Sequence, residues 1–172
     1  MGELLATRIA APVLDRCRNY LREPGISVVR DAQVVSSVGQ PSAMHDPTEG
    51  GLSTGLWELA WASGTKIEVD LDQVFVLPET LTLCQHLNLD PLGLMASGAL
   101  LVTASPQNSE RMVAALQDEG IHASMIGHVV EGKAGVWVRT SSGSAPFPSF
   151  DRDELARLFE EPESLDQDVD VS

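Results

Sequence analysis

The chain has 172 residues, a length that suits one folded domain, and hydrophobic residues make up 43% of it, enough to form a core. Its 25 acidic and 11 basic residues give a formal net charge of -14, which disfavours nucleic acids and anionic membrane surfaces as partners. The sequence has no apolar run near the roughly 20 residues of a membrane span, no recognisable targeting signal and only two cysteines, so we expect a reduced protein of the cytoplasm.

The first third of the chain predicts two helices followed by a short extended segment. Residues 12–21 place apolar side chains at helical spacing, and Glu23-Pro24-Gly25 ends this helix. Residues 26–38 contain many β-branched residues but keep helical spacing, which favours a second helix. After a turn at residues 39–41, residues 42–45 are expected to be extended.

The next segment predicts a long helix and a strand with one buried face. The helix covers residues 46–63 and ends at Gly64, a residue typical of helix C-termini. It is unusually apolar, so we expect it to be largely buried or to meet another domain. The strand covers residues 66–72, because three apolar residues alternate there with polar ones: Ile67, Val69 and Leu71.

A helix, a loop, a strand and another helix are expected in the third quarter. Pro78 suits the first position of a helix that runs to about His86. Residues 90–93 predict a loop and residues 98–104 an apolar strand. Ser105-Pro106 begins the next helix, which continues to Glu119.

The last part predicts a hairpin, a loop, a short helix and a tail. Residues 121–130 and 135–139 are expected to be strands joined by a turn at Glu131-Gly132-Lys133. A loop at residues 141–149 leads to a helix at 151–159 with a capping box of Asp151 and Glu154. Residues 160–172 contain six acids and no base, so a disordered tail is expected. The whole pattern indicates an α+β domain with a mixed β-sheet flanked by helices.

The segment Asp46-Pro47-Thr48-Glu49-Gly50-Gly51 combines helix-start signals with two glycines. Asp46 suits the N-cap, Pro47 the first helical position and Glu49 the capping box. Gly50 and Gly51 would then lie in the first turn, where each costs up to about 1 kcal/mol relative to alanine. Glycine there lets another group approach the backbone, and free amides at the positive end of a helix suit an anion.

A structural explanation of these glycines stays open, because they could simply permit tight packing, and spacing alone slightly favours that explanation. Ser97-Gly98, before an apolar strand, has the same two explanations. His45 could contact a phosphate or be a partly exposed residue at the end of a strand. The four histidines form no metal-binding pattern, so no metal site is expected, and Cys84 is expected to be a buried thiol.

Three blocks of the sequence resemble one known family. Residues 43–52, Ala-Met-His-Asp-Pro-Thr-Glu-Gly-Gly-Leu, resemble the Asp-x-Thr-x-Gly-Gly-Leu signature in the C-terminal domain of HypE-type hydrogenase maturation proteins. These proteins belong with aminoimidazole ribonucleotide (AIR) synthase, selenophosphate synthetase and thiamine-monophosphate kinase in the PurM-like superfamily. Residues 89–101 resemble the next block, and residues 105–129 resemble the closing helix and strand. The blocks occur in the family's order over about residues 26–139.

The resemblance implies an AIR synthase C-terminal-domain-like fold with three layers, α/β/α. It also implies ATP and Mg²⁺ as cofactors of a full-length homodimer, whose N-terminal nucleotide-binding domain carries most of the site. A group of residues would contact phosphate or substrate between the two domains: His45, Asp46, Thr48, Glu49, Gly50, Gly51, Ser97 and Gly98. The catalytic residues stay unassigned.

The resemblance further implies a division of the chain. Residues 1–25 would connect to an N-terminal domain outside this sequence, residues 26–145 would form the family domain, and residues 146–172 would be a short helix with the acidic tail. We therefore expect the chain not to be catalytic alone and not to bind ATP or Mg²⁺ tightly.

Two departures from the HypE pattern argue against carbamoyl dehydration. HypE proteins end in a cysteine that carries the carbamoyl group, whereas this sequence ends in Asp170-Val171-Ser172. Ala96-Ser97-Gly98-Ala99 stands where HypE usually has Asn-Glu-Gly-Lys. The alternative hypothesis is a non-enzymatic interaction or regulatory module.

Overall fold

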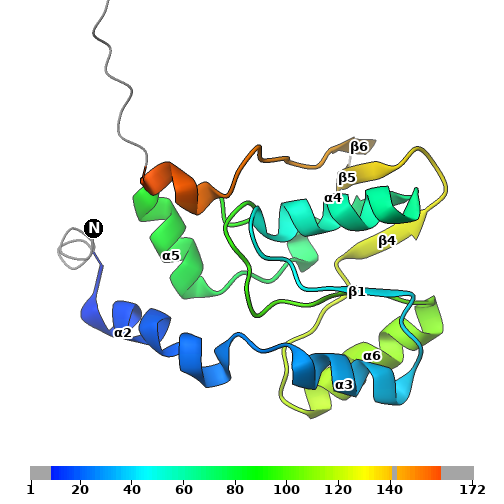
Figure 1. The fold of residues 1–172 in the computed structure, drawn as a ribbon, viewed down its shortest axis with the longest axis horizontal. Helices are drawn as coiled ribbons and strands as arrows, with labels where there is room; N and C mark the ends of the chain where they lie inside the picture. The colour runs from blue at the N-terminus through cyan, green and yellow to red at the C-terminus, as the bar shows by residue number, and fades with distance from the viewer. Residues whose placement is uncertain (1–8, 141–142, 160–172) are drawn as a thin grey trace, which may run out of the picture.

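The computed structural model describes residues 9–140 and 143–159. Helices and strands alternate along this part of the chain, which confirms the α+β class (Figure 1). The elements are α2 (Ala11–Asn19), η1 (Leu21–Gly25), α3 (Val29–Val38), β1 (Ala43–His45), α4 (Gly51–Ser63), β2 (Lys66–Val69), η2 (Leu71–Gln73), α5 (Pro78–Leu87), β3 (Leu101–Thr103), α6 (Pro106–Asp118), β4 (Gly127–Val130), β5 (Gly135–Thr140), β6 (Gly143–Pro146) and η3 (Glu154–Leu158).

The strands form two sheets rather than one. β1 and β3 make a two-stranded antiparallel sheet, and the other strands make a mixed sheet in the order β4-β2-β5-β6. β2 pairs antiparallel with β4 and parallel with β5. The predicted hairpin of β4 and β5 is therefore wrong, because β2 lies between the two strands. The short connection at residues 131–134 crosses over β2 instead of making a tight turn between neighbours.

Helix α4 packs against the four-stranded sheet and makes the larger core. Its buried side chains meet β2, β3, β5 and the segment after β6 in one cluster: Leu56, Ala60, Ile67, Val69, Leu101, Val136 and Phe147. Leu52, Trp57 and Leu59 are partly buried against this cluster, while Trp61 is 64% exposed. The expectation of a largely buried helix is confirmed, and Gly64 ends it in the left-handed conformation.

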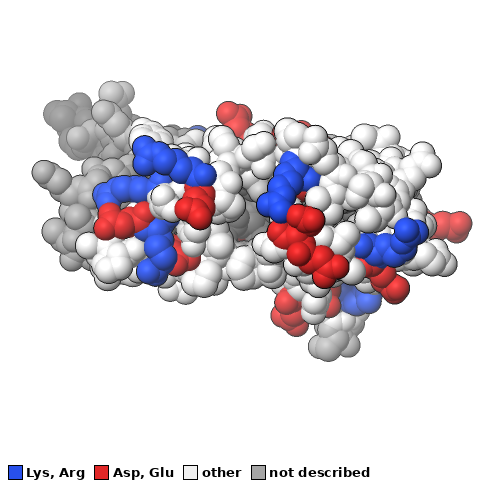
Figure 2. Space-filling view, turned by 90° about the horizontal axis from the view of Figure 1, so that it is seen from below, with Lys and Arg blue, Asp and Glu red and all other residues white. Residues whose placement is uncertain are grey.

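Helices α3 and α6 pack on each other on the other side of β1 (Figure 1). Val35, Met112 and Leu116 form a second, smaller core there. Arg30 in the first turn of α3 forms an ion pair with Glu119, the C-cap residue of α6. In Figure 2, basic and acidic side chains lie beside one another, with uncharged surface between the groups.

The N-terminal helix α2 is held against α5 by a buried carboxylate. Glu79 accepts hydrogen bonds from Arg16 Nε at 2.6 Å and from the Tyr20 hydroxyl at 3.0 Å. The Arg16 guanidinium is the main reason that the pKa of Glu79 lies below its usual value. Glu79 is 8% exposed, so this contact fixes residues before the predicted domain boundary to the rest of the fold.

The segment of residues 143–159, called the C-terminal strap below, differs most from expectation. Part of the predicted loop forms β6, which pairs with β5. Phe147, which follows β6, is 2% exposed and belongs to the larger core. The predicted helix is only the 3-10 turn η3, and its N-cap is Asp153, not Asp151. Residues 1–8 and the predicted acidic tail at 160–172 lie outside the described residues.

Several predicted elements are shorter than the sequence suggested. The first helix ends at Asn19, and α3 begins only at Val29. β2 ends at Val69, because Asp70 caps η2 by accepting from the Asp72 amide, so Leu71 is 38% exposed. The apolar strand predicted from residue 98 starts at Leu101, and the strand predicted from residue 121 starts at Gly127. Among the described residues, no helix is long and apolar enough to cross a membrane.

Candidate functional site

The N-cap of α4 lies four residues after the predicted position. Asp46 does not cap the helix, and Glu49 does not complete a capping box; α4 begins at Gly51 with Gly50 as its N-cap. Gly50 and Gly51 have φ angles of 73° and 63°, which lie in the left-handed region. A right-handed helix cannot run through two such residues, so Asp46 to Glu49 form a loop that precedes the helix.

Close packing explains why Gly51 is glycine. A Cβ atom at this position would lie 2.7 Å from the carbonyl oxygen of Leu92 and closer still to that of Leu94. The Ser53 amide donates to the same Leu92 oxygen at 2.9 Å. The loop of residues 92–96 therefore presses directly on the first turn of α4. Tight packing, the structural explanation left open by the sequence, accounts for this residue.

The backbone amides of both glycines already have acceptors. The Gly50 amide donates to Asp153 Oδ2 at 2.8 Å, and the Gly51 amide donates to the Thr48 carbonyl at 3.1 Å. The second carboxylate oxygen of Asp153 accepts from the Leu155 amide at 2.8 Å. A carboxylate of the C-terminal strap thus occupies the position at Gly50 that the sequence analysis offered to an external anion. Sequence reasoning missed Asp153, because nothing in the sequence links residues 50 and 153.

Other residues of the strap contact α4 and residues 90–93 near this carboxylate. The Pro148 carbonyl accepts from the Ser53 hydroxyl at 2.5 Å, and the Phe150 ring packs on Gly93. Glu154 accepts from the Asp90 amide at 2.8 Å and from Arg157. Burial raises the pKa of Glu154, but the bonds from Arg157 and the Asp90 amide outweigh burial and hold the pKa below its usual value.

The side chains of Asp46, Thr48 and Glu49, unlike the two glycine amides, are available to an external ligand. All three residues are exposed. Within the described part of the chain, none of these side chains makes a hydrogen bond or ion pair. Their backbone is nevertheless fixed, since the Thr48 carbonyl accepts from the amides of Gly51 and Ala96. The loop therefore presents free polar groups on a fixed backbone.

The other sequence-predicted residues lie near this loop but have other partners. His45 is at the end of β1, and its Nε2 atom lies 2.7 Å from Oε2 of Glu58. Ser97 and Gly98 are exposed and follow Ala96, the residue that is bonded to Thr48. Gly98 has a φ of 97° and packs on the backbone of Gly25 and Ile26. The structure thus brings the two glycine segments side by side.

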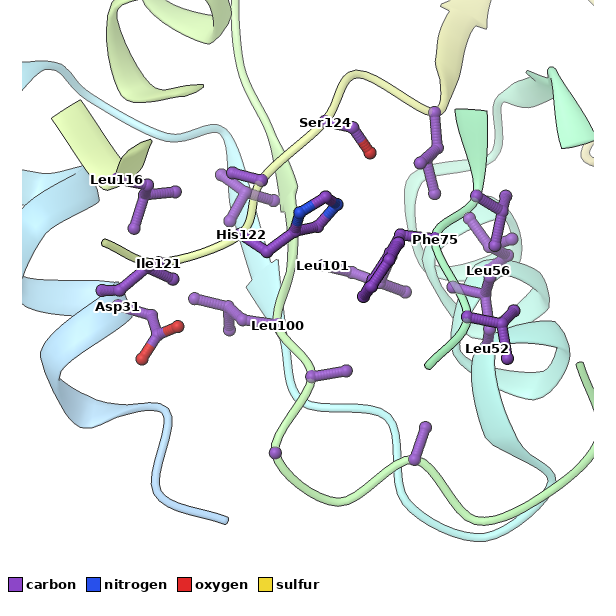
Figure 3. A pocket seen from close by; sticks show the side chains of 18 of the residues that line it. Asp31, Leu52, Leu56, Phe75, Leu100, Leu101, Leu116, Ile121, His122 and Ser124 are labelled. Carbon is purple, nitrogen blue, oxygen red and sulfur yellow. The ribbon is translucent and has the colours of Figure 1, made fainter. Parts of the chain in front are cut away.

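A large apolar cavity opens next to Ser97 and Gly98. Its volume is about 840 Å³, and it lies between α3 and α6 on one side and α4 and β2 on the other. Figure 3 shows Leu116, Ile121 and Leu100 on the first side and Leu52 and Leu56 on the second, with Phe75 and His122 between them. The Phe75 and His122 rings stack with centroids 4.0 Å apart. Residues 45–51 do not line this cavity, whereas Ser97 and Gly98 do.

Two further sequence predictions concern a metal site and the thiol of Cys84. In residues 9–140 and 143–159, no group of three or more histidine, cysteine or acidic side chains is placed to hold a metal ion. Cys84 is 2% exposed, which confirms the predicted buried thiol. Burial, followed by the nearby Asp90, raises the pKa of Cys84, which keeps the thiol protonated and unreactive.

Comparison with known proteins assigns the fold. Residues 20–139 match the family described as AIR synthase related protein, C-terminal domain. The chain belongs to this family. The resemblance deduced from the three sequence blocks is confirmed, and the match begins six residues before the range of about residues 26–139 that was expected. The C-terminal strap begins after the matched part of this AIR synthase related domain.

Curated relatives of the AIR synthase related domain are mostly HypE proteins. It is 34% identical over 115 residues to "Carbamoyl dehydratase HypE" of Cupriavidus necator, covering 65% of this chain and 33% of that protein. It is 35% identical over 89 residues to the protein of the same name from Rhizobium leguminosarum, covering 51% of this chain and 25% of that one. The domain therefore spans a quarter to a third of the length of these relatives.

Solved HypE structures share the fold. The hydrogenase maturation protein HypE of Escherichia coli superposes with a TM-score of 0.67 and 28% identity, covering 76% of this chain and 42% of that one. A HypE protein solved in complex with ATP superposes with a TM-score of 0.64 and 30% identity, covering 72% of this chain and 40% of that one. The AIR synthase related domain is thus related to nucleotide-binding proteins.

Proposed function

We propose that this domain is the C-terminal part of an ATP-dependent, HypE-like protein and forms one wall of a cleft for nucleotide or substrate. The opposite wall would be an N-terminal nucleotide-binding domain, and the complete protein would be a homodimer. The wall consists of His45, Asp46, Thr48 and Glu49, held in place by the Gly50-Gly51 turn. The domain alone lacks the other wall, so it binds neither ATP nor Mg²⁺ tightly and is not catalytic.

The exposed, unbonded side chains of Asp46, Thr48 and Glu49 carry this proposal. Because the backbone of this loop is already fixed, a ligand that binds these three polar groups would have to order only their side chains. Two of them are acidic, so direct contact with a phosphate is unfavourable, and Mg²⁺ between carboxylate and phosphate is the chemistry that fits. The Gly50 and Gly51 amides, by contrast, have internal acceptors and hold the loop. Ser97 and Gly98 would line the neighbouring part of the cleft.

Calorimetric titration with Mg-ATP tests the proposal. The 172-residue chain is compared with a polypeptide in which an AIR synthase-type N-terminal half precedes it. We expect no measurable binding to the chain alone and clear binding to the longer protein. In the longer protein, Asp46→Asn and Thr48→Ala should each weaken Mg-ATP or substrate binding about tenfold, as expected for the loss of one ligand contact.

Asp118→Asn is the matched control, since Asp118 is an exposed carboxylate at the end of α6, far in sequence from the loop. It should leave the affinity unchanged. A longer protein that binds no nucleotide would refute the proposal. Equal losses for Asp46→Asn and Asp118→Asn would show that residues 45–49 form no wall.

One observation favours a second candidate, a module without catalytic function. Asp153 already supplies the carboxylate at the Gly50 amide, so the start of α4 is complete without an external anion. In that case the loop would serve only the fold or a protein partner. Thermal stability that is unchanged by Mg-ATP in the longer protein would favour this candidate.

A further inference from the structure

The apolar cavity separates the two hydrophobic cores of the molecule. Its walls contain side chains of both: Leu56, Ile67 and Val69 from the larger core, and Val35, Met112 and Leu116 from the smaller one. Protein interiors are close-packed, so a space of this size between two cores is unusual. Its volume of about 840 Å³ lies in the range of about 300 to 1,000 Å³ that is typical of sites for small molecules. A small organic molecule is therefore an occupant of matching size.

The lining of the cavity contains one carboxylate. Asp31 is the single aspartate, glutamate, lysine or arginine among the described residues that line the cavity. Within the described part of the chain its side chain makes no hydrogen bond or ion pair, and the neighbouring Arg30 pairs with Glu119 instead. In Figure 3, Asp31 lies on the same side of the cavity as Leu100 and Ile121. A carboxylate without a partner beside apolar walls is stabilised by a cation.

The helix dipole also favours an acidic residue at this position, because Asp31 lies in the first turn of α3. This effect explains why an acid is tolerated there. It leaves both carboxylate oxygens available to a ligand, so the two explanations are compatible, and only binding measurements on a cation distinguish them.

Two stacked rings provide an aromatic surface in the cavity. The Phe75 and His122 ring centroids are 4.0 Å apart, and Figure 3 shows both rings between the two apolar sides. Phe75 is 52% exposed, so a ligand can reach its ring. Aromatic rings attract both the rings of a ligand and organic cations. Apolar walls, an aromatic surface and one carboxylate together suit an aromatic amine.

We propose that the cavity binds a small aromatic molecule with one amino group, whose ammonium pairs with Asp31 and whose ring packs against Phe75 and the apolar walls. The net charge of the chain is -14, which disfavours fatty acids and other anions. A neutral hydrocarbon would fill the apolar space but leave Asp31 without a partner. Residues 45–51 do not line the cavity, so the amine site neither contains the proposed nucleotide wall nor rests on it.

Fluorescence titration of the full chain tests the site with three dansyl probes that differ in the charge of their terminal group. Dansylcadaverine ends in an ammonium, N-acetyl-dansylcadaverine is neutral, and dansyl-6-aminohexanoate ends in a carboxylate. Dansyl fluorescence rises when the ring moves from water to apolar surroundings. The titration is made at about pH 8, where histidines are ordinarily neutral. We expect saturable binding of the ammonium probe with a Kd below about 100 μM, and binding of the other two at least about tenfold weaker.

Two substitutions test the assigned contacts. Asp31→Asn should weaken binding of the ammonium probe about tenfold and leave the neutral probe unchanged. Phe75→Ala should weaken both probes at least about threefold. Asp118→Asn and Trp61→Ala are the matched controls, because Asp118 is an exposed carboxylate and Trp61 a 64% exposed ring, and neither lines the cavity. Both controls should bind the probes like the wild type.

Two outcomes overturn the proposal. One is the absence of saturable binding of the ammonium probe up to about 1 mM, the limit of weak binding. The other is a lack of charge preference, seen as equal affinities for the three probes or as equal losses for Asp31→Asn and Asp118→Asn. Asp31 and Phe75 lie in different segments, so a folding defect in one variant leaves the other as a test. The titrations use no nucleotide, so their failure would leave the proposed function unaffected.

Discussion

Gly51 is the residue where one added methyl group should cost most. Its φ of 63° disfavours any side chain, and a Cβ would meet the carbonyls of Leu92 and Leu94. The left-handed conformation costs about 1 kcal/mol and overpacking adds about 2 kcal/mol. We therefore expect Gly51→Ala to lower the free energy of unfolding by about 3 kcal/mol, measured by urea denaturation.

Gly64→Ala separates the two contributions. Gly64 has nearly the same φ, 66°, but no atom lies within 4 Å of its Cβ position. This substitution should cost only about 1 kcal/mol, the cost of the left-handed conformation. Equal losses for the two variants would mean that the 92–94 loop moves aside freely. The loop beside Asp46 and Thr48 would then be less rigid than the proposed wall requires.

Glu154 should make stability depend on acid pH. Its pKa is lowered in the folded chain, so its contribution is fully present above the pKa of an unfolded glutamate, about 4.3, and is lost as the pH falls through the folded pKa. The stability difference between wild type and Glu154→Gln should therefore shrink below about pH 4. Thermal unfolding from neutral to acid pH measures it, with Glu110→Gln, an exposed residue of α6, as control. A difference that stays constant over that range contradicts this assignment.

The role of a single residue was predictable where it depends on neighbours in the sequence. The buried Cys84 follows from its apolar neighbours, and Gly64 follows from the end of a periodic helix. Asp153 was not predictable, since its role depends on a contact with Gly50, which is distant in sequence. The two glycines were recognised as unusual, but their left-handed conformation places the N-cap at Gly50 instead of Asp46. The helix-start signals at Asp46 and Pro47 failed because the left-handed glycines that follow them interrupt a right-handed helix.

Among the elements, the C-terminal strap leads to a prediction about truncation. A chain that ends at Thr140 lacks β6, the buried Phe147 and the carboxylates of Asp153 and Glu154. Loss of a buried phenylalanine alone costs about 3 to 5 kcal/mol, comparable to the whole stability of many domains. We expect this chain to lose its cooperative unfolding transition in urea.

A chain that ends at Phe159 is the control, since it keeps every contact described for the strap. Its transition should coincide with that of the full chain. If the chain ending at Thr140 unfolds cooperatively at the wild-type urea concentration, the strap is dispensable, and the folded domain coincides with the family match at residues 20–139.

Helices were predicted better than strand pairing. α5 and α6 begin at the prolines that the sequence marked, Pro78 and Pro106. Strand pairing failed because neighbouring strands in the sequence need not be neighbours in a sheet. β6 was missed since its Ser-, Gly- and Pro-rich sequence lacks strand propensity, and pairing with β5 alone makes it a strand.

For the whole molecule, the ordered sequence blocks were enough to identify the family and the fold class, whereas the cavity was not visible in them. A cavity is the space left between elements, and it depends on how α3 and α6 sit relative to α4 and β2. The division at residues 1–25, 26–145 and 146–172 stays a prediction. The bond network of Arg16, Tyr20 and Glu79 nevertheless ties α2 to α5.

The central position of β2 sets the order in which the chain can fold. Lys66 to Val69 pair with Gly127 to Val130 and with Gly135 to Val138, so both partners of this strand are made long after it. Such non-local pairing slows folding. During synthesis β2 remains unpaired until nearly the whole domain has left the ribosome. Until then, β4 and β5 do not cover Ile67 and Val69. Newly made chains should therefore depend on chaperones at this stage more than their small size suggests.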